Sequence, residues 1–347
     1  MGHTGFKGKW LTLWLSIMGA KVYGYSNEKK YFSNIFFNNK IININGDISD
    51  FFKLKKFIKK VQPDFIFHFA AQALVSESYL RPHKTWVSNV MGTVNLLESC
   101  KNIKKKLCLI LITSDKAYRN IEKNSGYKET DELNGNDPYS ASKSSADIAI
   151  QSYFKSIFNK KKNIKGAITR AGNVIGGGDL SKDRIIPDFY KAYINKKKLI
   201  IKNPSSTRPW QFVLEPLSGY LLLGKLLYQN KINNYEAYNF GPKVNYNFKV
   251  VDLIKEIQNN NIRLKFKLTN KKNKFKEAKL LKLNSNKART NLKWNSVLTF
   301  KETIKFTIGW YKGLIQGKNN KEMKKLSISQ IEEYFRKAKK IGLDWTK

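Results

Sequence analysis

Two short runs of the sequence combine residue types that can move protons. Tyr139 and Lys143 lie four positions apart, so a helix would place the phenol and the ammonium on one face. A nearby ammonium stabilises a phenolate and lowers the pKa of the phenol, so the pair predicts a base acting on a hydroxyl group. The same spacing arises by chance in a Lys-rich chain, where it would mean an ordinary surface helix.

The second run is Thr113-Ser114-Asp115-Lys116, which follows the apolar stretch 107–112. Such a stretch predicts a buried strand, and ligands of parallel sheets bind beyond the carboxyl ends of the strands. A hydroxyl, a carboxyl and an amine at that place suit hydrogen bonding, proton donation and proton removal. The plainer interpretation is a loop with ordinary polar residues.

Glycines at positions 2, 5 and 8 have the spacing of a dinucleotide-binding turn. Glycine at these positions permits a tight turn, close approach to a pyrophosphate and close packing of the next helix. Such a turn normally follows a buried parallel strand. Here only Met1 precedes Gly2, so the sequence has no residues to form that strand. We therefore expect a sheet that lacks its first strand, or a start that lies upstream.

The elements around these runs alternate as strand and helix. Strands are expected at 20–25, 41–48, 64–71, 107–113 and 166–175, and helices at 9–18, 51–61, 83–100 and 138–158. The spacing predicts an α/β fold with a Rossmann-like, doubly wound parallel sheet and a smaller C-terminal substrate lobe. We expect a dinucleotide-binding domain at 1–176, a substrate lobe at 177–318 that partly returns to the first domain, and a helical tail at 319–347. The charged run 271–276 is expected to be a loop.

Composition excludes several classes of protein. The net charge of +39 would suit nucleic acid, but the excess is Lys rather than Arg and is spread along the chain, which indicates a compositional bias. The two cysteines and three histidines form no metal-binding pattern, so we expect no metal site and a reducing, cytoplasmic compartment. Apolar runs are shorter than the roughly 18 residues that span a bilayer, so neither a membrane nor a nucleic acid is an expected partner.

Beyond these patterns, the chain resembles the CDP-glucose 4,6-dehydratases, a family of extended short-chain dehydrogenase/reductase proteins. The resemblance covers nearly the whole chain and rests on the segments 2–8 (GHTGFKG), 67–72 (FHFAAQ), 89–93 (NVMGT), 113–116 (TSDK), 137–143 (DPYSASK), 170–179 (RAGNVIGGGD), 208–211 (RPWQ), 213–223 (VLEPLSGYLLL) and 326–331 (LSISQI). Lys116 is its most specific element, because related dTDP-glucose and GDP-mannose dehydratases resemble this chain but have Glu in that place.

The resemblance implies a hydro-lyase reaction on a nucleotide sugar with NAD as cofactor. Tyr139, helped by Lys143 and Ser114, would remove the proton of the sugar 4-hydroxyl during oxidation at carbon 4. Lys116 would then take the carbon 5 proton, and Asp115 would protonate the departing 6-hydroxyl. Hydride returned to carbon 6 completes a 4-keto-6-deoxy sugar, which implies a role in dideoxysugar and lipopolysaccharide O-antigen biosynthesis.

The resemblance also implies binding residues and a homodimer built from the helices at 83–100 and 138–158. The expected cofactor-binding residues are Gly2, Gly5, Phe6, Gly8, Asp47, Ile48, Ala70, Ala71, Gln72, Asn89, Tyr139 and Lys143. The expected substrate-binding residues are Asn173, Arg184 and Arg208. No carboxylate follows the strand at 20–25 to hold the adenosine ribose, so the residues themselves leave NAD and NADP open, and only the resemblance favours NAD.

Three other functions remain open at this level. A 4-epimerase of the same fold would keep Tyr139 and Lys143 but would need no Asp115–Lys116 pair. A cationic nucleic-acid-binding protein is disfavoured by the scattered lysines. An inactive, N-terminally truncated product would follow from the absent first strand.

Overall fold

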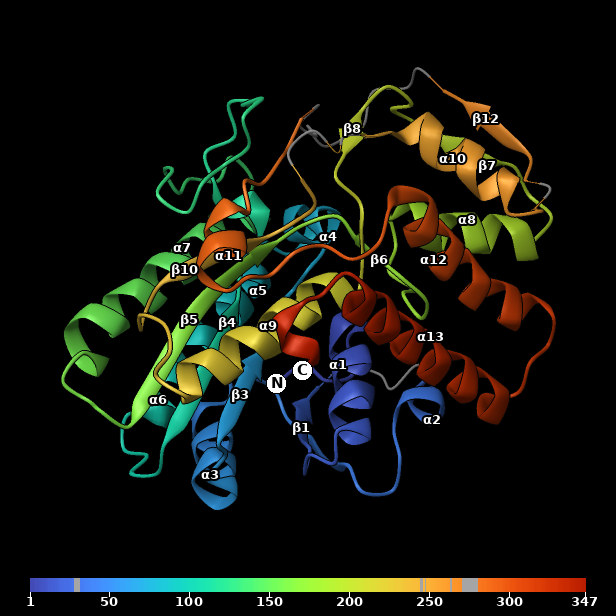
Figure 1. The fold of residues 1–347 in the computed structure, drawn as a ribbon. Coiled ribbons are helices and arrows are strands. Elements are labelled where there is room, and N and C mark those ends of the chain that lie inside the picture. The colour runs from blue at the N-terminus through green and yellow to red at the C-terminus, as the bar shows by residue number, and fades with distance from the viewer. Residues whose placement is uncertain (28–31, 244–245, 247, 263, 270–279) are drawn as a thin grey trace.

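The computed structural model describes residues 1–27, 32–243, 246, 248–262, 264–269 and 280–347 (Figure 1). The charged loop expected at 271–276 lies outside these ranges.

Parallel strands form the main sheet, in the order β10-β5-β4-β3. Their bounds are β3 (Phe65–His68), β4 (Leu107–Ile112), β5 (Ile164–Ala171) and β10 (Ala237–Phe240). A second parallel pair contains β1 (Tyr23–Ser26) and β2 (Ile42–Asn45). Each of these strands with an expected counterpart is shorter than expected, although β5 begins two residues earlier and β1 ends one residue later. The predicted parallel α/β architecture is confirmed.

Helices cover both faces of the main sheet, as a doubly wound fold requires. Every residue of β4 is buried, and its side chains alternate between two apolar cores. Cys108 and Ile110 face the core with α1 (Phe6–Ile17) and α9 (Leu214–Tyr228). Leu109 and Leu111 face the core with α3 (Phe51–Val61), α6 (Gly92–Cys100) and α7 (Pro138–Tyr153). Figure 1 shows α9 lying across the face of β4 and β5.

Within the described ranges, no strand lies between β1 and β3, as we expected. Met1 and Gly2 instead occupy this place, near the N label of Figure 1. The N-terminal amine donates to the Phe67 carbonyl at 3.0 Å, and the Phe69 amide donates to the Met1 carbonyl at 3.1 Å. The Gly2 amide donates to the Tyr25 carbonyl at 2.8 Å. Burial lowers the pKa of the N-terminal amine to about 5.

The helix expected at 83–100 is divided. It consists of α5 (Pro82–Trp86), a π-helical turn η1 (Val87–Met91) and α6. The wider turn rotates the side chains that follow it, and such bulges are frequent at functional sites. α7 is likewise followed by a π-helical turn, η3 (Phe154–Phe158), and begins after the cap Asp137 with Pro138 at its first position.

The strand expected at 166–175 is also interrupted. β5 ends at Ala171, and a short strand β6 (Val174–Ile175) follows. Asn173 has a φ of 53°, which turns the chain between the two strands. β6 pairs with β9 (Gln211–Phe212) rather than extending the main sheet.

The remaining elements lie mostly beyond residue 176. The strands are β7 (Leu199–Ile201), β8 (Thr207–Arg208), β11 (Phe248–Lys249) and β12 (Phe266–Leu268). The helices are α2 (Ser33–Phe36), α4 (Val75–Leu80), α8 (Ile185–Ile194), α10 (Val250–Asn259), α11 (Asn286–Asn291), α12 (Phe300–Ile315) and α13 (Asn320–Lys340), with short 3₁₀ turns η2 (Asp115–Ala117) and η4 (Asp344–Thr346). Of these, β7, β8, β12, α8, α10 and α12 form the upper right of Figure 1. The domain boundaries expected at 176/177 and 318/319 stay a prediction.

Candidate active site

A cavity of about 940 Å³ opens beyond the carboxyl ends of the parallel strands. The glycine turn and the ends of β1, β2 and β3 line one part of it, and the segments after β4 and β5 line another. With the exception of Asn89, every residue expected to bind or act on a ligand lines this cavity. The sequence motifs, although more than 200 residues apart at their extremes, therefore meet in one place.

The glycine turn has the geometry of an anion-binding cradle. Gly2 has a φ of 70°, and a Cβ there would lie 2.7 Å from the Ala70 amide nitrogen. A Cβ on Gly8 would lie 2.2 Å from the Gly2 carbonyl oxygen. Gly5 caps α1 without a side-chain hydrogen bond, so the first amides of this helix point their unpaired N–H groups toward the cavity end of the helix. Side chains at positions 2 and 8 would collide with the backbone of residue 70 and of the turn itself, so glycine is what lets the turn close, and its free amides at the cavity fit the pyrophosphate of a dinucleotide.

Lys7 also lines the cavity, although our sequence-based list omitted it. Burial and the charge of Arg184, opposed in part by Asp115, lower the pKa of the Lys7 ammonium to about 8. Within the described ranges no hydrogen bond or ion pair involves this ammonium. Its position between Gly5 and Gly8, in a turn that binds anions, was the signal that could have identified it.

Asp47 and Ile48 form the far wall of the cavity, next to the end of β1. Asp47 accepts hydrogen bonds from the Ser49 amide at 2.8 Å and the Ser49 hydroxyl at 2.7 Å, and also from Asn27. Burial raises the pKa of the Asp47 carboxyl, but these hydrogen bonds outweigh burial, so the pKa is lowered overall. The carboxylate is thus fixed rather than free to turn.

Asn89 lies behind the cavity wall and holds it in place. Its carbonyl oxygen accepts from the Gln72 amide at 2.7 Å, and its amide donates to the Gln72 carbonyl at 3.0 Å. It also donates to the Ser142 hydroxyl of α7 at 2.8 Å. Because Asn89 belongs to the π-helical turn η1, the irregular helix is what aims it at the segment of Ala70, Ala71 and Gln72.

The five expected catalytic residues come together at the centre of the cavity. Ser114, Asp115 and Lys116 begin the segment that follows β4, and Tyr139 and Lys143 lie on α7. The Ser114 hydroxyl donates to Asp115 Oδ1 at 3.0 Å and accepts from the Lys116 amide at 3.2 Å. Ser114 also acts on the nearby Tyr139 phenol, whose pKa it lowers.

The expected lowering of the pKa of Tyr139 was wrong for the protein alone. Burial raises the pKa of the phenol, and Ser114 offsets this only in part. Burial and the charge of Lys7 lower the pKa of the Lys143 ammonium to about 7. Because both groups lose water contact, each favours its neutral form.

The three expected substrate-binding residues line the end of the cavity formed by residues beyond 171. Arg184 forms an ion pair with Asp179 at 3.0 Å and stays 36% exposed. The Arg208 guanidinium donates to the Thr207 carbonyl at 2.8 Å. Two guanidinium groups at one end of a cavity suit the recognition of phosphate oxygens.

Other expectations concern what the site contains. Cys100 and Cys108 are both free and buried. Across the residues described, no cluster of His, Cys, Asp and Glu could hold a metal ion. In the same ranges, no helix has the length and apolarity needed to cross a bilayer.

Comparison with known proteins agrees with this geometry. The chain is 40% identical to the CDP-glucose 4,6-dehydratase of Salmonella typhimurium, over 96% of this chain and 94% of that protein. It is 30% identical to the dTDP-D-glucose 4,6-dehydratase of Dictyostelium discoideum, over 74% of this chain and 60% of that protein.

Solved structures share the fold. The UDP-glucuronic acid 4-epimerase of Bacillus cereus matches with a TM-score of 0.77 and 22% identity, over 90% of this chain and 98% of that one. The dTDP-glucose 4,6-dehydratase of Bacillus anthracis, solved with NAD, matches with a TM-score of 0.73 and 22% identity, over 90% and 94% of the two chains. Residues 1–307 match the family described as GDP-mannose 4,6 dehydratase. This match and the 40% identity over almost the entire chain show that the chain belongs to that family of nucleotide-sugar dehydratases.

Proposed function

We propose that the chain is an NAD-dependent CDP-glucose 4,6-dehydratase, a hydro-lyase that forms CDP-4-dehydro-6-deoxy-D-glucose. One observation carries the proposal: Asp115 and Lys116 line the same cavity as Tyr139 and Lys143. A 4-epimerase needs only the second pair, whereas loss of water across carbons 5 and 6 needs a further acid and base. The 40% identity with the Salmonella typhimurium enzyme supports CDP-glucose as the substrate.

The residues divide the work by their positions. Tyr139, beside Ser114 in the cavity, would take the proton of the sugar 4-hydroxyl. Lys116 would remove the carbon 5 proton, which the 4-ketone makes acidic. Asp115, protonated, would donate to the 6-hydroxyl as it leaves as water. The cofactor NAD, held at the glycine turn, would supply the hydride chemistry at carbons 4 and 6.

The glycine turn would hold the cofactor through its pyrophosphate, with Phe6 and Gly8 on one side and Asp47 and Ile48 toward the adenosine. The negative phosphates would raise the pKa values of Lys7 and Lys143, which burial lowers in the protein alone. Charged Lys143 would then stabilise the Tyr139 phenolate. We propose that Asn173, Arg184 and Arg208 bind the nucleotide sugar.

We further propose a homodimer that pairs two copies through α5, η1, α6 and α7. These segments contact one another and leave large apolar side chains in water: Trp86 is 39% exposed, Met91 50% and Ile148 53%. Large exposed apolar side chains on neighbouring segments favour burial against a partner. A cytoplasmic location, supported by two free cysteines, and a place in dideoxysugar and O-antigen biosynthesis belong to the same proposal. So does the division into an NAD-binding part (1–176), a sugar-binding lobe (177–318) and a helical tail (319–347).

The test is incubation of the purified protein and NAD with CDP-glucose, followed by mass spectrometry of the nucleotide sugar. We expect a product lighter by one water. A product of unchanged mass with an altered sugar would indicate the 4-epimerase instead. Turnover of dTDP-glucose but not of CDP-glucose would overturn the nucleotide assignment.

A further inference from the structure

Arg170 is a buried cation that contacts three separate parts of the active site's surroundings. It lies on β5, and its side chain is 1% exposed. Nε and Nη2 each donate to Asp147 at 2.8 Å. Nη1 donates to the Tyr118 hydroxyl at 2.7 Å and to the Glu129 carbonyl at 3.1 Å. The planar guanidinium thus uses its fork on one carboxylate and its remaining nitrogen on two loop oxygens.

Asp147 extends this contact to the helix of the proposed base and to the end of β4. It lies on α7, one turn beyond Lys143, and is fully buried. Its Oδ2 also accepts from the Thr113 hydroxyl at 2.9 Å. Because Thr113 directly precedes Ser114, the Arg170–Asp147 pair holds the beginning of the segment that carries Ser114, Asp115 and Lys116.

Tyr118 holds the end of the same segment. It is the residue directly after the 3₁₀ turn η2. Its hydroxyl accepts from Arg170 and donates to Asn239 Oδ1 of β10 at 2.8 Å. Its ring lies 4.8 Å from the Arg170 guanidinium carbon. Both ends of the stretch from Thr113 to Tyr118 are therefore attached to the Arg170 side chain, directly at Tyr118 and through Asp147 at Thr113.

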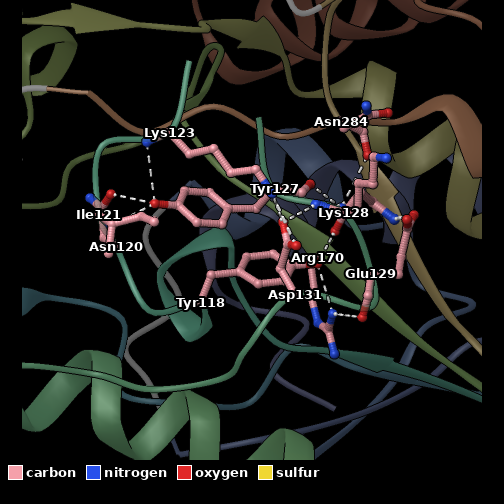
Figure 2. Close-up of polar contacts among 11 residues, drawn as sticks. Tyr118, Asn120, Ile121, Lys123, Tyr127, Lys128, Glu129, Asp131, Arg170 and Asn284 are labelled. Carbon is pink, nitrogen blue, oxygen red and sulfur yellow. Dashed lines mark hydrogen bonds and ion pairs between the residues drawn. The ribbon is translucent and has the colours of Figure 1, made fainter. Parts of the chain in front are cut away.

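The loop after Tyr118 is folded so that it supports these contacts (Figure 2). The Tyr127 ring stacks on Tyr118 at 5.3 Å, and its hydroxyl accepts from the Ile121 amide at 2.7 Å. Lys123 and Asp131 form an ion pair at 3.0 Å across the loop. The Glu129 carboxylate accepts from the Asn239 amide at 2.8 Å, which fixes the backbone that Arg170 contacts.

We propose that Arg170 is a positioning residue that sets Asp115 and Lys116 for the elimination of water. This inference rests on the proposed function and deepens it. In that step Lys116 takes the carbon 5 proton, the electron pair forms the carbon 5–carbon 6 double bond, and the carbon 6–oxygen bond breaks as Asp115 gives the oxygen its proton. The two groups act on neighbouring carbons at once, so their mutual placement decides the rate.

Elimination depends on Arg170 more than oxidation does. Tyr139 and Lys143 belong to a sixteen-residue helix that has its own cap at Asp137. Asp115 and Lys116 belong to a single 3₁₀ turn, which has little stiffness of its own. A buried ion pair adds little stability compared with apolar side chains of the same volume. The contribution of the Arg170–Asp147 pair is therefore the fixed position that its paired hydrogen bonds give to the neighbouring segment.

The test uses Arg170→Lys, which keeps the charge but loses the fork, and Tyr118→Phe, which leaves the Arg170–Asp147 pair intact. Arg119→Lys is the matched control, since Arg119 lies in the same loop but pairs with Glu132 at the surface, where both are 58% exposed. Single turnovers with CDP-glucose are followed by the absorbance of the reduced cofactor and by mass spectrometry after quenching. Thermal melting with and without NAD measures folding and cofactor binding separately.

We expect both variants to reduce the cofactor at a rate near that of the unaltered protein and then to accumulate a 4-keto sugar two hydrogens lighter than the substrate. Elimination should slow by about 10- to 100-fold in Arg170→Lys and by less in Tyr118→Phe. Arg119→Lys should neither accumulate the 4-keto sugar nor slow elimination. Equal slowing of cofactor reduction and of water loss would overturn the inference, as would unchanged elimination in a Tyr118→Phe variant that melts normally. Failure of the unaltered protein to dehydrate CDP-glucose would instead overturn the proposed function.

Discussion

Gly172 lies directly behind the carboxyl group of Asp115. A Cβ built on residue 172 would lie 1.7 Å from Asp115 Oδ2 and 2.1 Å from its Cγ. The loop that ends β5 thus approaches the turn after β4 as closely as backbone allows, and the absence of a side chain at 172 is what gives the proposed acid its position.

Gly172→Ala should therefore push the Asp115 carboxyl out of place. A displacement on the order of 1 Å at a reacting group can lower a rate by about 100-fold, so elimination should fall strongly while cofactor reduction continues. Rapid-quench mass spectrometry should find the 4-keto sugar before water is lost. Gly224→Ala is the control, because a Cβ there meets its nearest atom at 3.5 Å, an ordinary contact. Normal dehydration by Gly172→Ala would mean that Asp115 is not the acid.

The close approach of Gly172 illustrates what local pattern can and cannot predict. The apolar run that became β4 and the spacing of Tyr139 and Lys143 are local features, so the sequence was enough to place them at a strand end and on a helix face. The contact of Gly172 with Asp115 depends on how two strands meet, and no periodicity reports it. The strand expected to continue to 175 ends at Ala171 instead, because Asn173 turns the chain at a positive φ that the apolar pattern does not predict.

The π-helical turn η1, the pKa of Tyr139 and the Arg170–Asp147 pair also could not be predicted from the sequence. The π-helical turn that aims Asn89 at Gln72 leaves no mark in an amphipathic pattern, so one regular helix was expected. The lowered pKa expected for Tyr139 counted a neighbouring ammonium but not burial, which is known only once the fold is known. Arg170 and Asp147 likewise looked like ordinary charged residues, and only the fold places them against each other.

Glu215 should make stability fall as the pH rises from about 4.5 to about 7. Burial raises the pKa of this carboxyl from 4.5 to about 7, although it accepts from the Leu298 amide and the Tyr334 hydroxyl. In that range the folded state holds a proton that the unfolded state has released, so each step up in pH favours unfolding. The full effect is on the order of 3 kcal/mol, at about 1.4 kcal/mol per pKa unit.

Glu215→Gln isolates this contribution, because the amide keeps an acceptor oxygen but does not titrate. Urea unfolding of both proteins at pH 5 and pH 8 should show the variant gaining free energy of unfolding, relative to the unaltered protein, at the higher pH. The same difference at both pH values would mean that Glu215 does not titrate in this range.

Met91→Glu should separate the proposed dimer into monomers. Met91 lies in η1 and is 50% exposed, so the new carboxylate is tolerated in the single chain but would be buried at a face shared by two copies. Light scattering after gel filtration should show half the mass of the unaltered protein. Phe52→Glu on α3 is the control, since Phe52 is 81% exposed on a helix outside the proposed interface. A monomeric unaltered protein, or a dimer that survives the change, would rule out this face.

Lys7→Met should weaken NAD binding and raise the pKa of Lys143. The Lys7 charge helps to lower the pKa of Lys143 to about 7, so removing it lets that ammonium keep its proton to higher pH. In the unaltered protein, Lys7 and Lys143 lose charge between about pH 7 and pH 8, so affinity for a dianionic pyrophosphate should fall as the pH rises through that window. The variant should bind more weakly at pH 6, where both lysines are charged in the unaltered protein. The fall of NAD affinity that remains in the variant comes from Lys143, and it should occur at a higher pH than in the unaltered protein.

Titration calorimetry with NAD between pH 6 and pH 9 measures both effects, and proton uptake on binding can be read from buffers of different ionisation enthalpy. Lys105→Met is the matched control, because Lys105 pairs with Asp64 at the surface and is 50% exposed. Such a pair contributes at most about 1 kcal/mol to stability and lies outside the cavity, so NAD affinity should not change. Equal affinity of Lys7→Met and Lys105→Met at pH 6 would show that the Lys7 ammonium faces no part of the bound cofactor. The charge at this corner of the cavity would then act on the nucleotide sugar alone, and the loss would appear in the Michaelis constant for CDP-glucose.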